Sequence, residues 1–179
     1  MFRTLDIVFP VFNESRILKE NVEALHTFLS NRIYIDWKIV IAENGSTDET
    51  LEIARFLSNK YSHVSVRSYE EPGRGRAVKD CWLLSNADLV CYMDVDLSTD
   101  LEALIVSLEH MNSDDFDILI GSRLLKDSKV YGRSFKRDFI SKTYSLIFRI
   151  ILGTKFKATP LMQWRFPVGF GPSLKTCPK

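Results

Sequence analysis

Short apolar runs alternate along the chain with longer segments in which apolar residues recur every three or four positions. The short runs predict β-strands, and the longer segments predict amphipathic helices. Strands are expected over residues 5–10, 37–43, 63–69, 87–93 and 116–122. Helices are expected over residues 14–31, 46–61 and 75–86, from residue 99 onward, and near 135–152. This alternation predicts βαβ units and a mostly parallel central sheet in one α/β domain.

Three of these helices follow residues that are typical of helix N-termini. Asn13 precedes the first helix, and Ser46 with Glu49 has capping-box spacing before the second. Thr99 and Glu102 repeat that spacing before the fourth helix. In a capping box the hydroxyl accepts a backbone N–H of the first turn, while the carboxylate reaches back to the cap. We therefore expect Asn13, Ser46 and Thr99 to be N-caps.

The chemically unusual residues follow the strands, where the chain enters a loop. In a parallel α/β sheet, ligands bind outside the carboxyl ends of the strands. The loops concerned are residues 10–14, 43–48, 70–76, 94–100 and 121–126. We expect all of them to converge on one edge of the sheet.

Paired carboxylates, Asp94 and Asp96, follow the strand expected at 87–93. Such oxygen ligands suit Mg²⁺ or Mn²⁺, and Mg²⁺ is usually held by one or two carboxylates together with substrate phosphates. A cation would also neutralise this negative charge at the end of a buried strand. Ordinary helix capping in a solvated loop explains the same residues equally well. Both interpretations therefore stay open for Asp94 and Asp96.

Residues 43–48 offer Glu43, Asn44 and Asp48 around a Gly-Ser turn. Their oxygens suit hydrogen bonds from the N–H of a nucleotide base or from a ribose hydroxyl, as in dinucleotide-binding folds. Turn chemistry and a helix cap account for the same residues without any ligand.

The loop before the third helix combines Gly73 and Gly75 with Arg74, Arg76 and Lys79. Close backbone approach at glycine and positive charge at a helix start are typical of anion binding. The spacing of a Walker loop is absent. A surface turn without a ligand is an equally good local explanation.

Charge is distributed unevenly along the chain, although the formal net charge is only +1. Residues 1–120 hold 11 Lys and Arg against 21 Asp and Glu, whereas residues 121–179 hold 13 against 2. The basic part includes Arg123, Arg133 and Arg137, whose guanidinium groups suit phosphate oxygens. We expect this basic part to bind an anion. The alternative is that the basic and acidic halves of the chain attract each other. Nucleic acid is disfavoured as that anion because the expected ligand edge is acidic.

The helix expected at 135–152 carries an apolar stripe beside basic residues. That pattern suits a membrane interface, and equally an ordinary core-facing helix with a solvated basic face. No stretch reaches the roughly 18 apolar residues of a membrane span. Cys81, Cys91 and Cys177 form no C-x-x-C pair, which argues against a disulfide framework or a zinc site. We therefore expect a cytoplasmic protein, soluble or peripheral on the cytoplasmic face of a membrane.

The ordered set of motifs resembles the family-two glycosyltransferases, most closely the branch that includes dolichyl-phosphate mannose and glucose synthases. The matching pieces are VFPVFNE, ENGSTDET, GRGRAVKD, YMDVDLSTD, IGSRLL and KRDFISKTYSLIFRIILGTKF, spread over residues 5–156. The resemblance implies a Rossmann-like GT-A nucleotide-sugar-binding fold over residues 1–156. It also implies a UDP- or GDP-linked sugar donor, Mg²⁺ or Mn²⁺ at the D-x-D motif, and a polyprenyl phosphate acceptor at a membrane surface.

The resemblance gives each matching position a role. It implies that Asp94 and Asp96 bind the metal, and that Arg123 and Arg137 meet donor or acceptor phosphates. The expected catalytic residues are Asp96, Arg123 and Arg137. The residues expected to bind the donor are Pro10, Phe12, Glu14, Glu43, Asp48, Arg74, Lys79 and Asp94. Family members usually have two aspartates where this chain has Glu43 and Asn44.

The resemblance does not extend over residues 157–179, which we treat as an atypical C-terminal tail. Related enzymes continue with a D-x-Q-C-G-F-K type motif that closes over the site, whereas this chain reads KATPLMQWRFPVGFGPSLKTCPK. The Q-x-x-R-W motif of processive synthases is absent from the tail as well. We therefore expect a truncated or frame-shifted end.

The expected reaction is attack by a polyprenyl phosphate oxygen on the anomeric carbon of a nucleotide-bound hexose, with inversion. An ionised phosphate needs no general base, which agrees with the absence of an evident catalytic histidine. One alternative is a shortened chain that binds a nucleotide sugar without turnover. Another is a phosphatase of the haloacid-dehalogenase type, in which the first Asp of a D-x-D is a nucleophile. That motif normally follows the first strand, and here four expected strands precede it.

Overall fold

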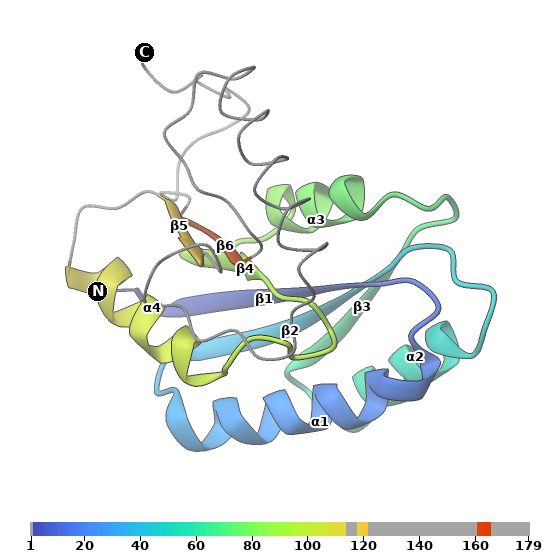
Figure 1. Ribbon diagram of the computed structural model, residues 1–179, viewed down its shortest axis with the longest axis horizontal. Helices are drawn as coiled ribbons and strands as arrows, with labels where there is room; N and C mark the ends of the chain where they lie inside the picture. The colour runs from blue at the N-terminus through green and yellow to red at the C-terminus, as the bar shows by residue number, and fades with distance from the viewer. Residues whose placement is uncertain (1, 114–117, 122–160, 166–179) are drawn as a thin grey trace, which may run out of the picture. The chain divides into compact units, whose positions relative to one another are not determined.

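A computed structural model of the chain describes residues 2–113, 118–121 and 161–165. These residues form a six-stranded sheet in the order β3-β2-β1-β4-β6-β5, flanked by helices (Figure 1). The strands are β1 (Thr4–Val11), β2 (Asp36–Glu43), β3 (Val64–Ser68), β4 (Leu89–Tyr92), β5 (Ile118–Gly121) and β6 (Leu161–Arg165). The helices are α1 (Ser15–Arg32), α2 (Thr50–Lys60), α3 (Arg74–Leu83) and α4 (Glu102–Ser113).

The first four strands of the chain run parallel. β1 pairs with both β2 and β4, and β2 pairs with β3, always in the parallel direction. β6 pairs with β4 in the antiparallel direction, with Gln163 opposite Cys91 and Arg165 opposite Leu89. The prediction of an α/β fold with a mostly parallel sheet is confirmed. β6 lies in the segment expected to be a tail, and the apolar pattern does not predict it.

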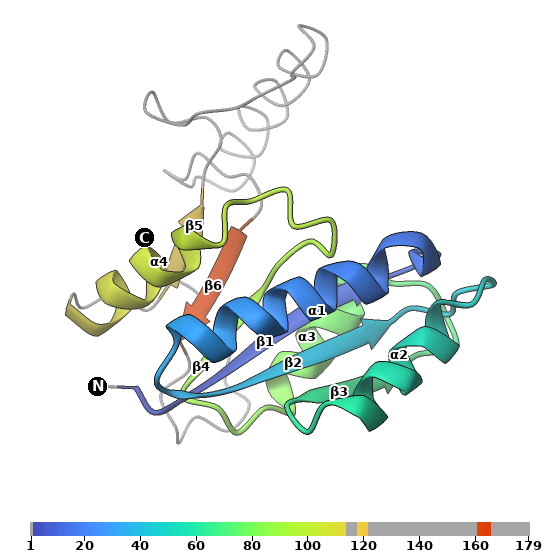
Figure 2. The ribbon, with the colours of Figure 1, turned by 90° about the horizontal axis from the view of Figure 1, so that it is seen from below.

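Helices cover both faces of the parallel strands. α1 and α2 lie on one face and α3 lies on the other (Figures 1 and 2). Under α3, Val8 of β1 and Val40 of β2 form a buried cluster with Ala77, Val78 and Cys81 of the helix. A parallel sheet that is covered on both faces explains why the β1 and β2 sequences are nearly continuous apolar runs rather than alternating ones.

The described parallel core belongs to one compact unit. This unit holds β1 to β4, the four helices and residues 163–165 of β6. Residues 120–162 form a second unit. Of this unit the structure describes only residues 120–121, at the end of β5, and residues 161–162, at the start of β6. The helix expected near 135–152 lies outside the described residues, as do Arg123, Arg133 and Arg137. Of the helices in the described part, none combines the length and apolar character needed to cross a membrane.

The helix starts differ from the expected caps. α1 begins at Ser15, after Glu14, and the side chain of Glu14 does not cap it. Asn13 has a positive φ of 55°, and its Oδ1 accepts the backbone N–H of Thr47 at 2.8 Å. Ser46 Oγ in turn accepts the backbone N–H of Asn13 at 3.0 Å. Two residues expected to cap separate helices therefore connect the loops after β1 and β2, and the cap predictions for them are wrong.

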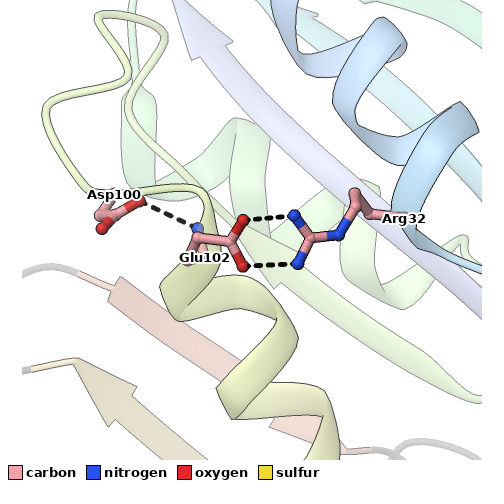
Figure 3. A network of polar contacts seen from close by, with 3 residues as sticks. All are labelled: Arg32, Asp100 and Glu102. Carbon is pink, nitrogen blue, oxygen red and sulfur yellow. Dashed lines mark hydrogen bonds and ion pairs between the residues drawn. The ribbon is translucent and has the colours of Figure 1, made fainter.

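Asp100, rather than Thr99, supports the start of α4. Its Oδ1 accepts the backbone N–H of Glu102 at 3.0 Å (Figure 3). The Glu102 carboxylate makes two hydrogen bonds, of 2.6 and 2.8 Å, with the guanidinium of Arg32 at the end of α1. The capping-box prediction is wrong here because a partner on another helix takes the carboxylate.

A cluster of rings joins α1 to the edge of the sheet formed by β2 and β3. The ring of His26 lies 4.2 Å from that of Tyr61 and 5.2 Å from that of Trp37, measured between centroids. Burial lowers the pKa of His26 below its usual value, and the nearby charges of His63 and Lys60 lower it further. The folded protein therefore favours the neutral imidazole of His26.

Acidification through pH 6.5 is expected to destabilise the protein through His26. Because the pKa of His26 is lower in the folded state than its unfolded value near 6.5, the unfolded chain binds the proton more tightly. The free energy of unfolding is then highest above that pH and falls as the pH drops through it. Urea unfolding between about pH 8 and about pH 5.5 measures the fall. The variant His26→Phe keeps a ring and is expected to flatten the profile; an unchanged slope would contradict this assignment.

Candidate active site

Carboxylates from three loops meet at the carboxyl edge of the parallel strands. Glu14 follows β1, Asp48 follows β2, and Asp94 and Asp96 follow β4. The pKa of Glu14 is raised, first by burial and then by the negative charges of Asp96, Asp48 and Asp94. Such like-charge effects require close approach of the carboxylates. The predicted convergence is therefore confirmed for these loops, whereas the loop at 121–126 lies outside the described residues beyond Gly121.

The two aspartates of the D-x-D motif flank a buried residue, Val95. Val95 is only 4% exposed, and its carbonyl accepts the side-chain amide of Asn21 of α1 at 2.9 Å. With Val95 turned into the core and held by α1, the flanking residues Asp94 and Asp96 are left at the surface. This alternation gives the D-x-D spacing a structural reason.

Asp94 and Asp96 belong to a turn rather than to an extended strand. The backbone N–H of Leu97 donates to the carbonyl of Asp94 at 3.2 Å, and Leu97 has a positive φ of 47°. Asp96 Oδ1 accepts the backbone N–H of Ser98 at 3.0 Å. The turn provides a bend of the kind that two carboxylates in D-x-D spacing need in order to face one cation.

These carboxylates supply part of a coordination shell. Within the described residues, no three carboxylate, imidazole or thiol groups are placed to hold a metal ion by themselves. Mg²⁺ is commonly held by one or two carboxylates, with substrate phosphates and water completing its shell. The crowding of negative charge that raises the pKa of Glu14 also favours a cation at this edge. Asp94 and Asp96 therefore fit a divalent ion that arrives with a phosphate ligand.

Arg74, the first residue of α3, lies at the same edge. Its guanidinium forms an ion pair with Asp94 and lies 5.6 Å from the ring centroid of Tyr92. Arg76 of α3 bonds the carboxylate of Glu71 in the preceding loop, at 3.0 Å, and Lys79 is exposed. The loop predicted to bind an anion therefore reaches the acidic edge through Arg74.

Glu43, at the end of β2, is a buried carboxylate with a structural role. It is 1% exposed and accepts the backbone N–H of Ser46 at 2.5 Å. Its other oxygen accepts the hydroxyl of Ser68, at the end of β3, at 2.7 Å. Glu43 thus joins the turn after β2 to the neighbouring strand, and both of its oxygens have partners inside the protein.

Asn44 is also buried, at 3% exposed. Its Nδ2 donates to the carbonyls of Ala42, at 3.2 Å, and Val11, at 3.4 Å. These two bonds fix the orientation of the amide, because turning it would place Oδ1 against two carbonyl oxygens. Oδ1 itself has no hydrogen-bond partner among the described residues.

Asp48 ties the start of α1 to the start of α2. It accepts the backbone N–H of Ser15 at 3.2 Å, the backbone N–H of Thr50 at 3.0 Å and the hydroxyl of Thr50. These bonds, led by the one from the hydroxyl of Thr50, lower the pKa of Asp48 to about 2. Because α2 begins at Thr50 with this support, the capping box predicted for Ser46 and Glu49 is wrong.

The end of β1 adds two of the residues expected to bind the donor. Pro10 is half-buried and lies opposite Ala42 of β2. Phe12 follows the strand and is 47% exposed. A large ring left open to solvent at a polar edge offers a surface on which a planar ligand can stack.

Replacing Gly45 by Ala is expected to destabilise the protein by about 2 kcal/mol. Gly45 has a φ of +72°, and a Cβ atom there would lie 2.6 Å from the carbonyl oxygen of Glu70. Both the left-handed backbone and this contact oppose any side chain. Gly75→Ala is the matched control, since nothing lies within 4 Å of its Cβ position in α3. Urea unfolding should show loss only for Gly45→Ala; equal stability of the two variants would contradict the prediction.

The residues that support this edge have no signal in the sequence. Asn21 holds Val95, Thr50 and Ser68 bind the acidic side chains of the loop after β2, and Tyr92 lies beside Arg74. Each is an ordinary residue of a helix or strand. Only the order of the strands in the sheet brings them to the site.

Comparison with known proteins identifies the family to which this chain belongs. The model of glycosyl transferase family 2 matches residues 6–169, which is most of the chain. The chain belongs to glycosyl transferase family 2. The resemblance drawn from the motifs is thereby confirmed, and the phosphatase interpretation is wrong.

Three curated proteins illustrate what this family 2 chain is similar to. It is 31% identical over 153 residues to glycosyltransferase AglD of Haloferax volcanii, covering 83% of this chain and 24% of that protein. It is 32% identical over 149 residues to a dolichol-phosphate mannosyltransferase of Pyrococcus furiosus, covering 83% and 41%. It is 28% identical over 183 aligned positions to dolichyl-phosphate β-glucosyltransferase ALG5C of Trichomonas vaginalis, covering 89% and 53%. The chain therefore spans about half or less of the length of these relatives.

Solved structures share the fold of this family 2 chain at low sequence identity. Glucosyl-3-phosphoglycerate synthase from Mycobacterium tuberculosis, in complex with Mn²⁺ and UDP-glucose, has a TM-score of 0.59 at 18% identity, covering 91% of this chain and 56% of that one. Mannosyltransferase PcManGT from Pyrobaculum calidifontis, in complex with GDP-mannose and Mn²⁺, has a TM-score of 0.56 at 18% identity, covering 68% and 36%. These similarities concern the fold alone, and they confirm the GT-A fold class.

Proposed function

We propose that this chain is part of a metal-dependent inverting glycosyltransferase, which moves a hexose from UDP-glucose or GDP-mannose to a polyprenyl or dolichyl phosphate. The observation that carries the proposal is the placement of Asp94 and Asp96 in one turn at the carboxyl edge, beside Glu14 and Arg74. Relatives named for sugar transfer to dolichyl phosphate support the acceptor. Fold neighbours solved with Mn²⁺ and a nucleotide sugar support the donor and the metal.

In this proposal the described loops hold the donor. Asp94 and Asp96 would hold Mg²⁺ or Mn²⁺, and the ion would supply charge stabilisation for the leaving nucleoside diphosphate. Arg74 and Lys79 bind diphosphate oxygens, since cationic side chains at a helix start favour anions. The nucleotide pocket consists of Pro10, Phe12, Glu14, Glu43 and Asp48, with Glu43 acting by holding the turn after β2 in place.

The chemistry asks little of the protein beyond orientation and electrostatics. An ionised oxygen of the acceptor phosphate attacks the anomeric carbon from the side opposite the diphosphate, and the bond from that carbon to the diphosphate oxygen breaks. No proton is removed from the nucleophile, so no general base is needed. Arg123 and Arg137 are assigned to donor or acceptor phosphates. The lipid acceptor places the reaction at a membrane surface, to which the basic residues of 121–179 are suited.

A labelled-donor assay tests the function. The protein is incubated with a polyprenyl phosphate in detergent, Mn²⁺, and either labelled UDP-glucose or labelled GDP-mannose. Transfer of label to the lipid from one donor, and its loss when EDTA removes the metal, is the expected result. Label transfer that is unaffected by EDTA would contradict the metal assignment.

A second candidate is a protein that binds a nucleotide sugar without turnover. It is favoured by residues 157–179, which lack the D-x-Q-C-G-F-K type motif of related enzymes. Thermal stabilisation by UDP or GDP with Mn²⁺, without labelled lipid, is the result expected of this binding protein. Absence of both stabilisation and transfer would contradict both candidates.

A further inference from the structure

We propose that Arg74 competes with the divalent cation for Asp94, so that the cation binds tightly only together with the donor diphosphate. The inference rests on the proposed function, because it takes Asp94 as a metal ligand. It adds to that function a defined coupling between two ligands and a residue that produces it.

The starting observation is the side chain that Asp94 contacts in the structure. Arg74 Nη2 bonds Asp94 Oδ1, and the guanidinium lies 5.6 Å from the ring centroid of Tyr92. The side chains of Arg74 and Asp94 are 56% and 27% exposed, so water reaches both. An ion pair this open to solvent is weak and readily exchanged. Arg74 can therefore leave Asp94 when a better partner arrives.

A bare cation meets two obstacles at this carboxylate. It has to replace the guanidinium at Asp94, and it then lies close to a side chain of like charge. The described residues offer no third acidic, imidazole or thiol ligand to offset this cost. Metal binding without a nucleotide is therefore expected to be weak.

A nucleoside diphosphate removes both obstacles. Its oxygens accept the planar guanidinium in paired hydrogen bonds, as carboxylates and phosphates commonly do with Arg. Arg74 is the first residue of α3, where the partial positive charge of the helix N-terminus also favours an anion. Arg74 then passes to the diphosphate, and Asp94 becomes free for the cation. By linkage, each ligand strengthens the binding of the other by the same factor.

The test compares the affinities of the wild-type protein and the Arg74→Gln variant for Mn²⁺ alone. Electron paramagnetic resonance of the free ion measures these affinities. Removal of the guanidinium is expected to tighten binding of Mn²⁺ alone by about three- to tenfold. Binding of UDP or GDP at saturating Mn²⁺ is expected to weaken by about tenfold, because a charge-assisted contact to phosphate is lost. The coupling between metal and nucleotide should shrink accordingly.

Arg76→Gln is the matched control. Arg76 lies in the same first turn of α3 and carries the same charge, but its guanidinium bonds the carboxylate and the carbonyl of Glu71. Its removal changes the net charge equally without freeing Asp94, so binding of Mn²⁺ alone should stay within about twofold of wild type. An equal gain in both variants would overturn the proposal, since net charge alone would then explain it. Urea unfolding of each variant checks that the fold is unchanged.

The outcomes separate this inference from the proposed function. If the wild-type protein binds Mn²⁺ with UDP or GDP, and Arg74→Gln leaves the affinity for Mn²⁺ alone unchanged or weaker, competition is wrong and the function stands. If neither protein binds Mn²⁺ with or without nucleotide, both are wrong. Tighter binding of Mn²⁺ alone by Arg74→Gln, together with weaker nucleotide binding, supports the inference.

Discussion

Replacing Asp96 by Asn is expected to lower sugar transfer by at least about 100-fold while the protein remains folded. The amide has no negative charge and is a poorer ligand for a hard divalent cation than a carboxylate. Asn also retains the Oδ1 atom that accepts the backbone N–H of Ser98 at 3.0 Å, so the turn keeps its hydrogen bond. Transfer rates at saturating donor and Mn²⁺, together with urea unfolding, measure the two effects separately.

Asp100→Asn provides the control for this change. Asp100 lies on the same loop, but its Oδ1 accepts the backbone N–H of Glu102 at the start of α4. The same loss of charge there is expected to leave the transfer rate within about twofold of wild type, because Asp100 is bonded to the start of α4 and its exposed charge is screened by water and salt. Full activity of Asp96→Asn, or equal loss in both variants, would show that Asp96 has no special role.

Replacing Glu43 by Leu is expected to lower the free energy of unfolding by about 3 kcal/mol. Leu is similar in size and suits a buried position, so little of the effect comes from packing. The loss arises because the backbone N–H of Ser46 and the hydroxyl of Ser68 lose the carboxylate that accepts them. The backbone N–H of Ser46 is partly buried, so leaving it without an acceptor costs more than the bond itself contributes, whereas Ser68 is exposed and its hydroxyl can bind water instead. The urea midpoint and its slope measure the change.

Glu43→Gln separates the hydrogen bonds from the charge. Gln keeps one oxygen acceptor at almost the same position, and we expect it to lose only about 1 kcal/mol. If Glu43→Leu were as stable as wild type, the structural role of Glu43 would be wrong.

β1, β2 and β4 could be predicted from sequence because they are mostly buried and therefore appear as nearly continuous apolar runs, whereas β3 shows alternating apolar and polar residues. The starts of the helices could not, because cap-forming side chains have competing partners. Asn13 and Ser46 bond to each other's loops, and Glu102 bonds to Arg32. All of these partners are distant in sequence, so local spacing carries no information about them.

The candidate site, too, could be predicted from the sequence only in part. Asp94 and Asp96 could be located from sequence, since they follow an apolar run and the edge of a parallel sheet is fixed by its direction. The contact between Arg74 and Asp94 could not. These residues follow β3 and β4, which β2 and β1 separate in the sheet, and they meet because α3 crosses back over Val8 and Val40. That crossing depends on strand order, which the apolar pattern leaves open.

The bonds that connect the loops after β1 and β2 have a consequence for ligand affinity. Asn13 is tied to Ser46 and Thr47, and the backbone N–H of Glu14 donates to the hydroxyl of Thr50 at 2.8 Å. Two segments joined at several points lose their conformational freedom during folding rather than on association. If a nucleotide binds here as proposed, these two loops are expected to lose little further conformational entropy, so that more of the interaction energy is expressed as affinity.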